Sequence, residues 1–191
     1  MFKYSLFAVA AGSISILYKY YSDSLERSKQ ELARHKAETH ALRAEIIEIY
    51  TTFKSIRREL RYRGDYTENK PLIIMKKDYF ALRSKFNDMQ HRVEALKWRL
   101  DLSWDFLGSD QSEVLRLIKV IDKYTSSIGK DASLFNNLDD EKLIEIESDA
   151  QIFGFFQRNL QGSPVAVGFF EPMHHIRTIL RSRAEKLRGD G

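Results

Sequence analysis

The chain has 191 residues, of which 31 are Lys or Arg, 27 are Asp or Glu and none is Cys, so its formal net charge is +4. The lack of Cys excludes disulfide-stapled, zinc-thiolate and cysteine-nucleophile proteins. An apolar fraction of 43% is too high for a wholly disordered chain. Only 3 Pro and 9 Gly are available for the many turns that a many-stranded β fold needs, so the composition predicts an all-α protein.

The charges are arranged in blocks of opposite sign. Residues 19–100 carry 19 basic and 12 acidic side chains, whereas residues 101–150 carry 5 basic and 12 acidic ones, and residues 151–191 are basic again. Such blocks favour charge complementarity, within the chain or with a partner, over a uniform polyanion-binding surface. The alternative is that these charges are ordinary solvated faces.

The first residues form an uncharged segment. Residues 4–18 carry no charge and are bounded by Lys3 and Lys19. As a helix they span about 22 Å, which is shorter than a hydrocarbon core of about 30 Å. Snorkelling of the two lysines and interfacial Tyr side chains extend the usable length to residues 2–21. We therefore expect residues 1–22 to form a transmembrane or hydrophobic anchor helix.

Two other interpretations of this segment remain open: a cleaved signal peptide, and a buried helix of a soluble bundle. If it is a single-pass anchor, the excess of Lys and Arg after it predicts a C-terminal body that faces the cytoplasm, or the matrix of an organelle.

Heptad spacing begins at Leu25. One column of the seam consists of Leu25, Leu32, Thr39, Ile46, Phe53 and Leu60, and the other of Leu42, Ile49 and Ile56. Apolar residues at alternating steps of four and three are typical of a coiled-coil seam, and this one is degraded upstream of Leu42. Gly64 is expected to end the helix.

A second seam follows the link at residues 64–75. Its members are Tyr79, Leu82, Phe86, Met89, Val93, Leu96, Leu100, Ser103 and Leu107. The simplest prediction is a long antiparallel coiled-coil hairpin over residues 23–108, whose tip holds an apolar run at residues 72–75 that is either a cap or a short strand. The same stripes also fit pairing between chains, so oligomeric state stays open.

Residues 109–191 are predicted to form a small C-terminal helical bundle. A third helix is expected after a cap at Ser109 or Asp110, and a fourth after a cap at Asp139 or Asp140. A loop rich in Gly and Pro, with an exposed Phe169-Phe170 pair, then leads to a final amphipathic helix from about Pro172 to Leu187.

No arrangement of residues indicates an enzyme, and we expect no cofactor and no metal. The chain lacks phosphate-binding, dinucleotide-binding, serine-hydrolase and zinc-protease motifs. Glu171 and His174 have the spacing of a di-iron half-site, but a second copy is missing. Glu141, Glu145 and Asp149 would form an acidic ridge along the expected fourth helix. A solvated face, or a docking site for a basic partner, is the favoured interpretation over acid–base or metal chemistry.

The sequence thus predicts a membrane-anchored coiled-coil adaptor or scaffold that acts through protein–protein contacts or self-association. The candidate partner-binding residues are the apolar Leu72, Ile73, Ile74, Phe169 and Phe170, the basic Arg57, Arg58 and Arg61, and the acidic Glu141, Glu145 and Asp149. Two alternatives stand beside it: an accessory structural subunit of a larger membrane or organellar complex, and a helical nucleic-acid-binding protein. Nucleic acid is the less expected partner, because acidic residues intersperse the basic cluster.

Overall fold

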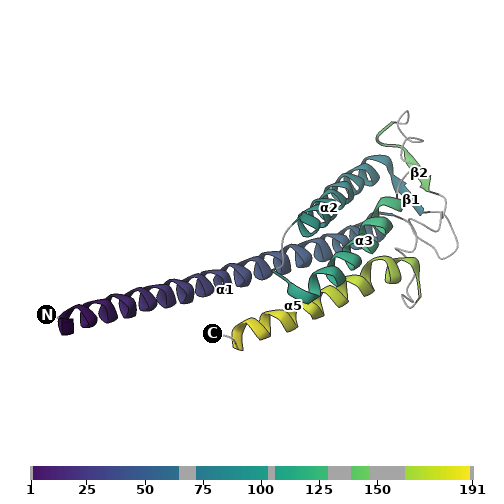
Figure 1. Ribbon diagram of the computed structural model, residues 1–191. Coiled ribbons are helices and arrows are strands. Elements are labelled where there is room, and N and C mark those ends of the chain that lie inside the picture. Colours follow the sequence, from purple (N-terminus) through teal and green to yellow (C-terminus); the bar gives the residue numbers. More distant parts are fainter. Residues whose placement is uncertain (1, 65–71, 103–105, 129–138, 147–161, 190–191) are drawn as a thin grey trace.

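The computed structural model describes residues 2–64, 72–102, 106–128, 139–146 and 162–189. These residues are mostly helical, as expected. The helices are α1 (Phe2–Arg63), α2 (Lys76–Leu102), α3 (Gln111–Ser127) and α5 (Glu171–Gly189), and a two-stranded sheet pairs β1 (Leu72–Met75) with β2 (Leu143–Ile146). Figure 1 shows α1 as one long rod whose second half lies in the helical body.

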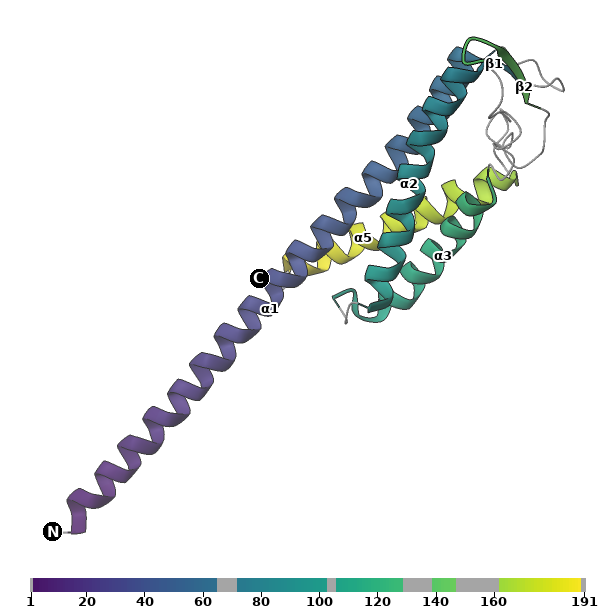
Figure 2. The ribbon, with the colours of Figure 1, turned by 90° about the horizontal axis from the view of Figure 1, so that it is seen from above.

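The body is a four-helix bundle. Helix α1 packs against α2, α2 against α3, α3 against α5, and α5 against α1, which closes the ring. Both views show each helix running back along the one before it, so the topology is up-down-up-down, with the C-terminus on the side of the body from which α1 projects (Figures 1 and 2).

From Thr39 onward, the predicted seam residues of α1 face the core of the bundle. Its apolar members between Leu42 and Leu60 are all buried, and Phe53 is fully enclosed. Upstream, Leu25 is 47% exposed, because this part of α1 projects beyond the other helices. The weak upstream seam predicted from the sequence therefore corresponds to a part of α1 that has no packing partner among the described residues.

The second seam is also confirmed within the described residues. Its buried members on and after α2 are Tyr79, Leu82, Phe86, Met89, Val93, Leu96, Leu100 and Leu107, whereas Ser103 lies outside the described residues. In the chain the two seams share one core with α3 and α5. The described helices of residues 109–191 therefore complete the hairpin's core and do not build a bundle of their own.

The helix expected after Asp139 is wrong for residues 143–146. This segment is strand β2, and it pairs with β1 in antiparallel register, with Ile74 opposite Ile144. Asp139 caps a tight turn: its carbonyl accepts from Lys142 N at 3.1 Å. In this strand Ile144 is buried between the exposed Leu143 and Glu145. The β-branched isoleucines of the segment suit a pleated surface more than a helix.

Replacing Ile144 with Ala should lower the free energy of unfolding by about 2 kcal/mol, the low end for a buried Ile, because the strand lies at the end of the bundle. Leu143→Ala is the matched control, with an expected cost below about 0.5 kcal/mol, since Leu143 is 62% exposed. Urea unfolding followed by circular dichroism measures both. Equal costs at the two positions would contradict the alternating strand.

The loop expected before the last helix is helical instead. Helical structure begins at Pro164, and a π-helical turn, η3 (Ala166–Phe170), leads into α5. Ser163 starts it as an N-cap: its hydroxyl accepts from Ala166 N at 3.2 Å, and Pro164 occupies the first helical position. Gly162, with φ of 71°, provides the left-handed turn just before the cap.

The third helix begins where predicted, with Asp110 at its N-cap position, but without the expected side-chain cap. The 3₁₀ turn η1 (Gly108–Asp110) precedes α3, and Asp110 makes no side-chain capping bond. Gly108 has φ of 57°, which reverses the chain between α2 and α3.

The prediction of a transmembrane helix finds no support in the structure. Across the described residues, none of the helices contains an apolar stretch long enough to cross a bilayer. The N-terminal segment is the first part of α1, which begins at Phe2. Every residue from Leu17 to Glu31 on this helix is exposed.

Candidate functional site: a basic face on α1 and α5

The charges on α1 are sorted to opposite sides of its seam. Acidic residues flank the seam on the side of α2, where Glu45 pairs with Arg99, Glu48 pairs with Arg92, and Glu59 accepts from Lys85 at 2.9 Å. The hydrogen bond from Lys85 lowers the pKa of Glu59 below its ordinary value. The acidic flank of α1 is thus neutralised by α2.

The opposite flank of α1 is basic. It carries Arg43, Lys54, Arg57, Arg58 and Arg61, a series that follows the seam at helical spacing. Among the described residues, no carboxylate lies within ion-pair distance of Arg43, Lys54 or Arg58. Arg43, Lys54 and Arg58 therefore keep their positive charge without an ion pair among the described residues, whereas Glu45, Glu48 and Glu59 on the other flank are paired.

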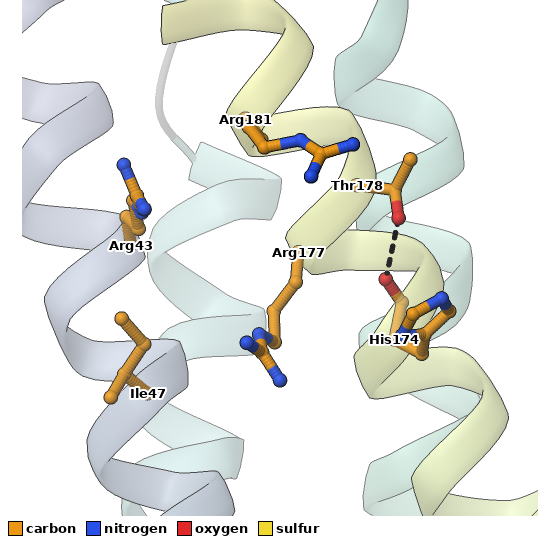
Figure 3. A pocket seen from close by; sticks show the side chains of 6 residues that line it. All are labelled: Arg43, Ile47, His174, Arg177, Thr178 and Arg181. Atoms are coloured by element: carbon orange, nitrogen blue, oxygen red, sulfur yellow. Dashed lines mark hydrogen bonds between the residues drawn. The ribbon is translucent and has the colours of Figure 1, made fainter.

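Helix α5 lies beside the basic flank and adds cations to it. A pocket of about 180 Å³ between the two helices is lined by Arg43, Ile47, His174, Arg177, Thr178 and Arg181. Figure 3 shows the Arg177 side chain extending from α5 into the space between the helices, with its guanidinium group across from Ile47 on α1 and Arg43 one turn away. Arg181 has only a loose contact with Glu185, at 3.9 Å between two highly exposed side chains.

Tyr50 holds two of these cations in place. The ζ carbon of Arg177 lies 5.3 Å from the ring centroid of Tyr50, and Nζ of Lys54 also lies 5.3 Å from it. Cations at this distance are attracted to the negative face of the ring. Phe170 meets the edge of the same ring, with centroids 6.0 Å apart, and so connects the face to the core.

A second pocket continues the face toward the tip of the hairpin. It has a volume of about 240 Å³ and is lined by Lys54, Arg57, Arg58 and Arg61. Ile47 and Arg58 are eleven residues apart on α1, so the two pockets are separated by about 16 Å along the helix. An elongated anionic partner lying along α1 reaches both.

Arg57 is the most enclosed cation of this face. It is 9% exposed, and its guanidinium lies 5.1 Å from the ring centroid of Phe170. Burial, together with the charge of neighbouring Arg61, lowers the pKa of Arg57 to about 10. The guanidinium is still cationic at neutral pH, and an anion that approaches it gains more than it would from a fully solvated Arg.

The predicted basic residues thus belong to one surface, but the predicted aromatic pair does not. Phe169 is fully buried, and its ring stacks on Phe53 with centroids 3.7 Å apart. The expectation that Phe169 is an exposed contact residue is wrong. Phe170 is half-buried and supports the basic face from below.

The apolar run at the hairpin tip is also mostly internal. Leu72 and Ile74 are buried against the core, whereas Ile73 on the other face of β1 is 42% exposed. Strand alternation explains this split, because successive side chains point to opposite faces. Of the three, only Ile73 is available as a surface contact.

The predicted acidic ridge does not form. Glu141 lies in a turn, Glu145 is exposed on β2, and Asp149 lies outside the described residues. Without a helix, the spacing of four no longer places these carboxylates on one face. One carboxylate of this region forms an ion pair within the chain: Asp140 pairs with Nζ of Lys76 at 3.1 Å.

Sequence reasoning missed Arg43, Lys54, Arg177 and Arg181. The signal for the first two was present, since steps of four and three from Arg43 through Tyr50 to Arg61 mark a single flank of the seam. No such signal existed for α5, because its position beside α1 is a tertiary contact.

The described residues contain no group of three or more His, Asp or Glu side chains that could hold a metal ion. No protein-family model matches the chain, and no curated protein or solved structure resembles it at a significant level.

Proposed function

We propose that this protein is a helical adaptor whose basic α1/α5 face binds an acidic segment of a partner protein. One observation carries the proposal: α2 neutralises the acidic flank of α1, whereas α5 adds further cations to the basic flank. An intramolecular role would instead place carboxylates on α5 opposite Arg43 and Lys54. Cations with exposed guanidinium and ammonium groups, on a rigid two-helix frame, suit an anionic partner helix or strand.

Charge reversal on this face should weaken partner binding, and photo-crosslinking measures the effect. A photo-crosslinking amino acid replaces Lys54 in the protein as it occurs in the cell. The same amino acid at Ser84, which is exposed on α2, is the matched control. We expect a protein adduct from position 54 alone, mapping to a segment rich in Asp and Glu. The adduct should fall at least tenfold when Arg58 and Arg177 are both changed to Glu, because two attractions become repulsions.

Other outcomes of this experiment decide between the alternatives. Crosslinks to RNA or DNA from position 54 would replace the adaptor with the nucleic-acid-binding function. Adducts of equal yield from positions 54 and 84, unaffected by charge reversal, would instead indicate a subunit enclosed on several sides by a larger complex.

We further propose that residues 2–21 attach the adaptor to a lipid bilayer as a hydrophobic anchor, with the bundle on the cytoplasmic or matrix side. The support is the uncharged segment at residues 4–18 and the Tyr18, Tyr20 and Tyr21 side chains, which are 68–77% exposed at its end. Exposed aromatic side chains next to an apolar segment suit the membrane interface. The exposed part of α1 then holds the bundle away from the lipid.

Deleting residues 2–21 should release the protein from membranes. We expect the full chain to stay with the membrane fraction through an alkaline wash, and the deletion variant to move almost entirely to the supernatant. A variant with Tyr18, Tyr20 and Tyr21 changed to Ser tests the aromatic contribution without shortening the chain. Full-length protein in the soluble fraction would refute the anchor while leaving the basic face intact.

A further inference from the structure

The pocket between α1 and α5 has more positive charge than a single carboxylate of a partner can neutralise. Arg43, His174, Arg177 and Arg181 are among the residues that line it. Three guanidinium groups from two helices line a space of about 180 Å³. Among the described residues, neither Arg43 nor Arg177 has a carboxylate within ion-pair distance. One carboxylate of a partner can neutralise only one of these cations.

We infer that this pocket binds a phosphoryl group carried by a phosphorylated side chain of the partner. A phosphomonoester carries a charge of about −1.5 to −2 at neutral pH and presents three acceptor oxygens. Arginine forks donate paired hydrogen bonds to such oxygens, so the ligand neutralises more of the pocket's positive charge than one carboxylate does and offers one acceptor oxygen for each guanidinium group. This inference rests on the proposed function, in which an acidic partner lies along the same face.

The donors of the pocket are the guanidinium groups and the imidazole. The Thr178 hydroxyl is already committed, because it donates to the His174 carbonyl oxygen at 3.1 Å within α5 (Figure 3). Arg177 is held between the helices by its contact with Tyr50, which limits its loss of conformational freedom when it binds. Arg43 lies on the rigid α1 frame on the other side of the pocket.

Geometry favours a phosphoprotein over a phospholipid as the source of this group. Arg43 lies 25 residues beyond Tyr18, which is about 37 Å along a helix. Surface charges act over about 8–10 Å at physiological ionic strength. When residues 2–21 are in the bilayer and α1 stands away from it, lipid headgroups do not reach this pocket.

Calorimetric titration of the full chain with O-phospho-L-serine tests the pocket without the unidentified partner. We expect saturable binding with Kd on the order of 1 mM, and L-serine and L-glutamate should bind at least tenfold more weakly. Arg43→Gln and Arg177→Gln should each weaken the binding of phosphoserine about tenfold. The matched control is Arg188→Gln, the same charge change at an exposed position on α5, with an expected change below twofold.

Three results would overturn the inference. They are no saturable phosphoserine binding, an equal loss for the Arg188 variant, and binding of glutamate as tight as that of phosphoserine. Circular dichroism confirms that each variant is folded, and Arg177→Lys keeps the charge if the Gln variant does not fold. Arg177-dependent binding to phosphatidic acid vesicles, with none to phosphoserine, would reassign the pocket to lipid.

The test also separates this inference from the proposed function. Loss of the crosslink at position 54 with phosphoserine binding retained would remove the acidic partner and keep the phosphoryl site. The reverse result, an acidic partner without phosphoserine binding, would keep the adaptor and reject the phosphoryl group.

Discussion

Replacing Phe53 with Ala should lower the free energy of unfolding by about 4 kcal/mol, within the range for removal of a buried aromatic ring. Phe53 is fully buried in the α1 seam, stacks on Phe169 and meets the edge of Phe170 at 5.7 Å between centroids. The variant leaves a cavity where α1 meets the η3–α5 segment. It therefore weakens one of the contacts that join the C-terminal part of the chain to the hairpin.

Urea unfolding of the full chain, followed by circular dichroism, measures this loss. Ile47→Ala on the same helix is the matched control, because Ile47 is 41% exposed and should cost less than about 1 kcal/mol. Equal midpoint shifts for the two variants would contradict the packing of Phe53 against Phe169. A midpoint shift with an unchanged slope would show that stability alone has changed.

Replacing Gly168 with Ala should cost about 3 kcal/mol, at the upper end for overpacking. A Cβ at this position would lie 2.5 Å from two ring carbons of Tyr124 on α3. The ring has little room to move, because Tyr124 packs against the core. Burial also raises the pKa of Tyr124 above its ordinary value.

A double-mutant cycle identifies the source of this cost. In a Tyr124→Ala background, Gly168→Ala should cost at least about 1 kcal/mol less than in the unmodified protein, because the two ring carbons that the new Cβ meets at 2.5 Å are removed and only the Cβ at position 124, at 2.8 Å, remains. Val167→Ala at the neighbouring exposed position should change stability by less than about 0.5 kcal/mol. Costs that add without coupling would show that α3 and η3 are further apart than the structure places them.

Both variants leave the charges of the basic face unchanged, and they probe the frame that holds it. Phe53 and Phe170 lie beneath Tyr50 and Arg57, so the position of α5 relative to α1 depends on the aromatic cluster. Loss of this packing should separate Arg43 from Arg177 and weaken phosphoserine binding as a secondary effect. The charge variants should weaken binding at unchanged stability, which distinguishes the two classes.

The sequence alone determined the helices with strong periodicity. The seams from Leu42 to Leu60 and from Tyr79 to Leu100 were predictable because a step of 3.6 residues repeats over many turns, and each apolar position adds to the same signal. The end of α1 at Arg63 followed from Gly64, and the last helix followed from the apolar side chains after Pro172. Arg57, Arg58 and Arg61 were likewise identified as candidate contact residues from charge alone.

Only the tertiary structure decided how these elements are used. Residues 143–146 are too few to show a period, and their pairing with β1 depends on a partner some 70 residues away. The burial of Phe169 depends on its contact with Phe53, which no local pattern predicts. The basic face is likewise a product of packing: charge sorting along α1 was encoded in the spacing, but the pocket exists because α5 returns along α1 and brings Arg177 and Arg181 to the same space as Arg43. Local sequence specifies which side chains share a helix face, whereas long-range contacts decide which faces meet.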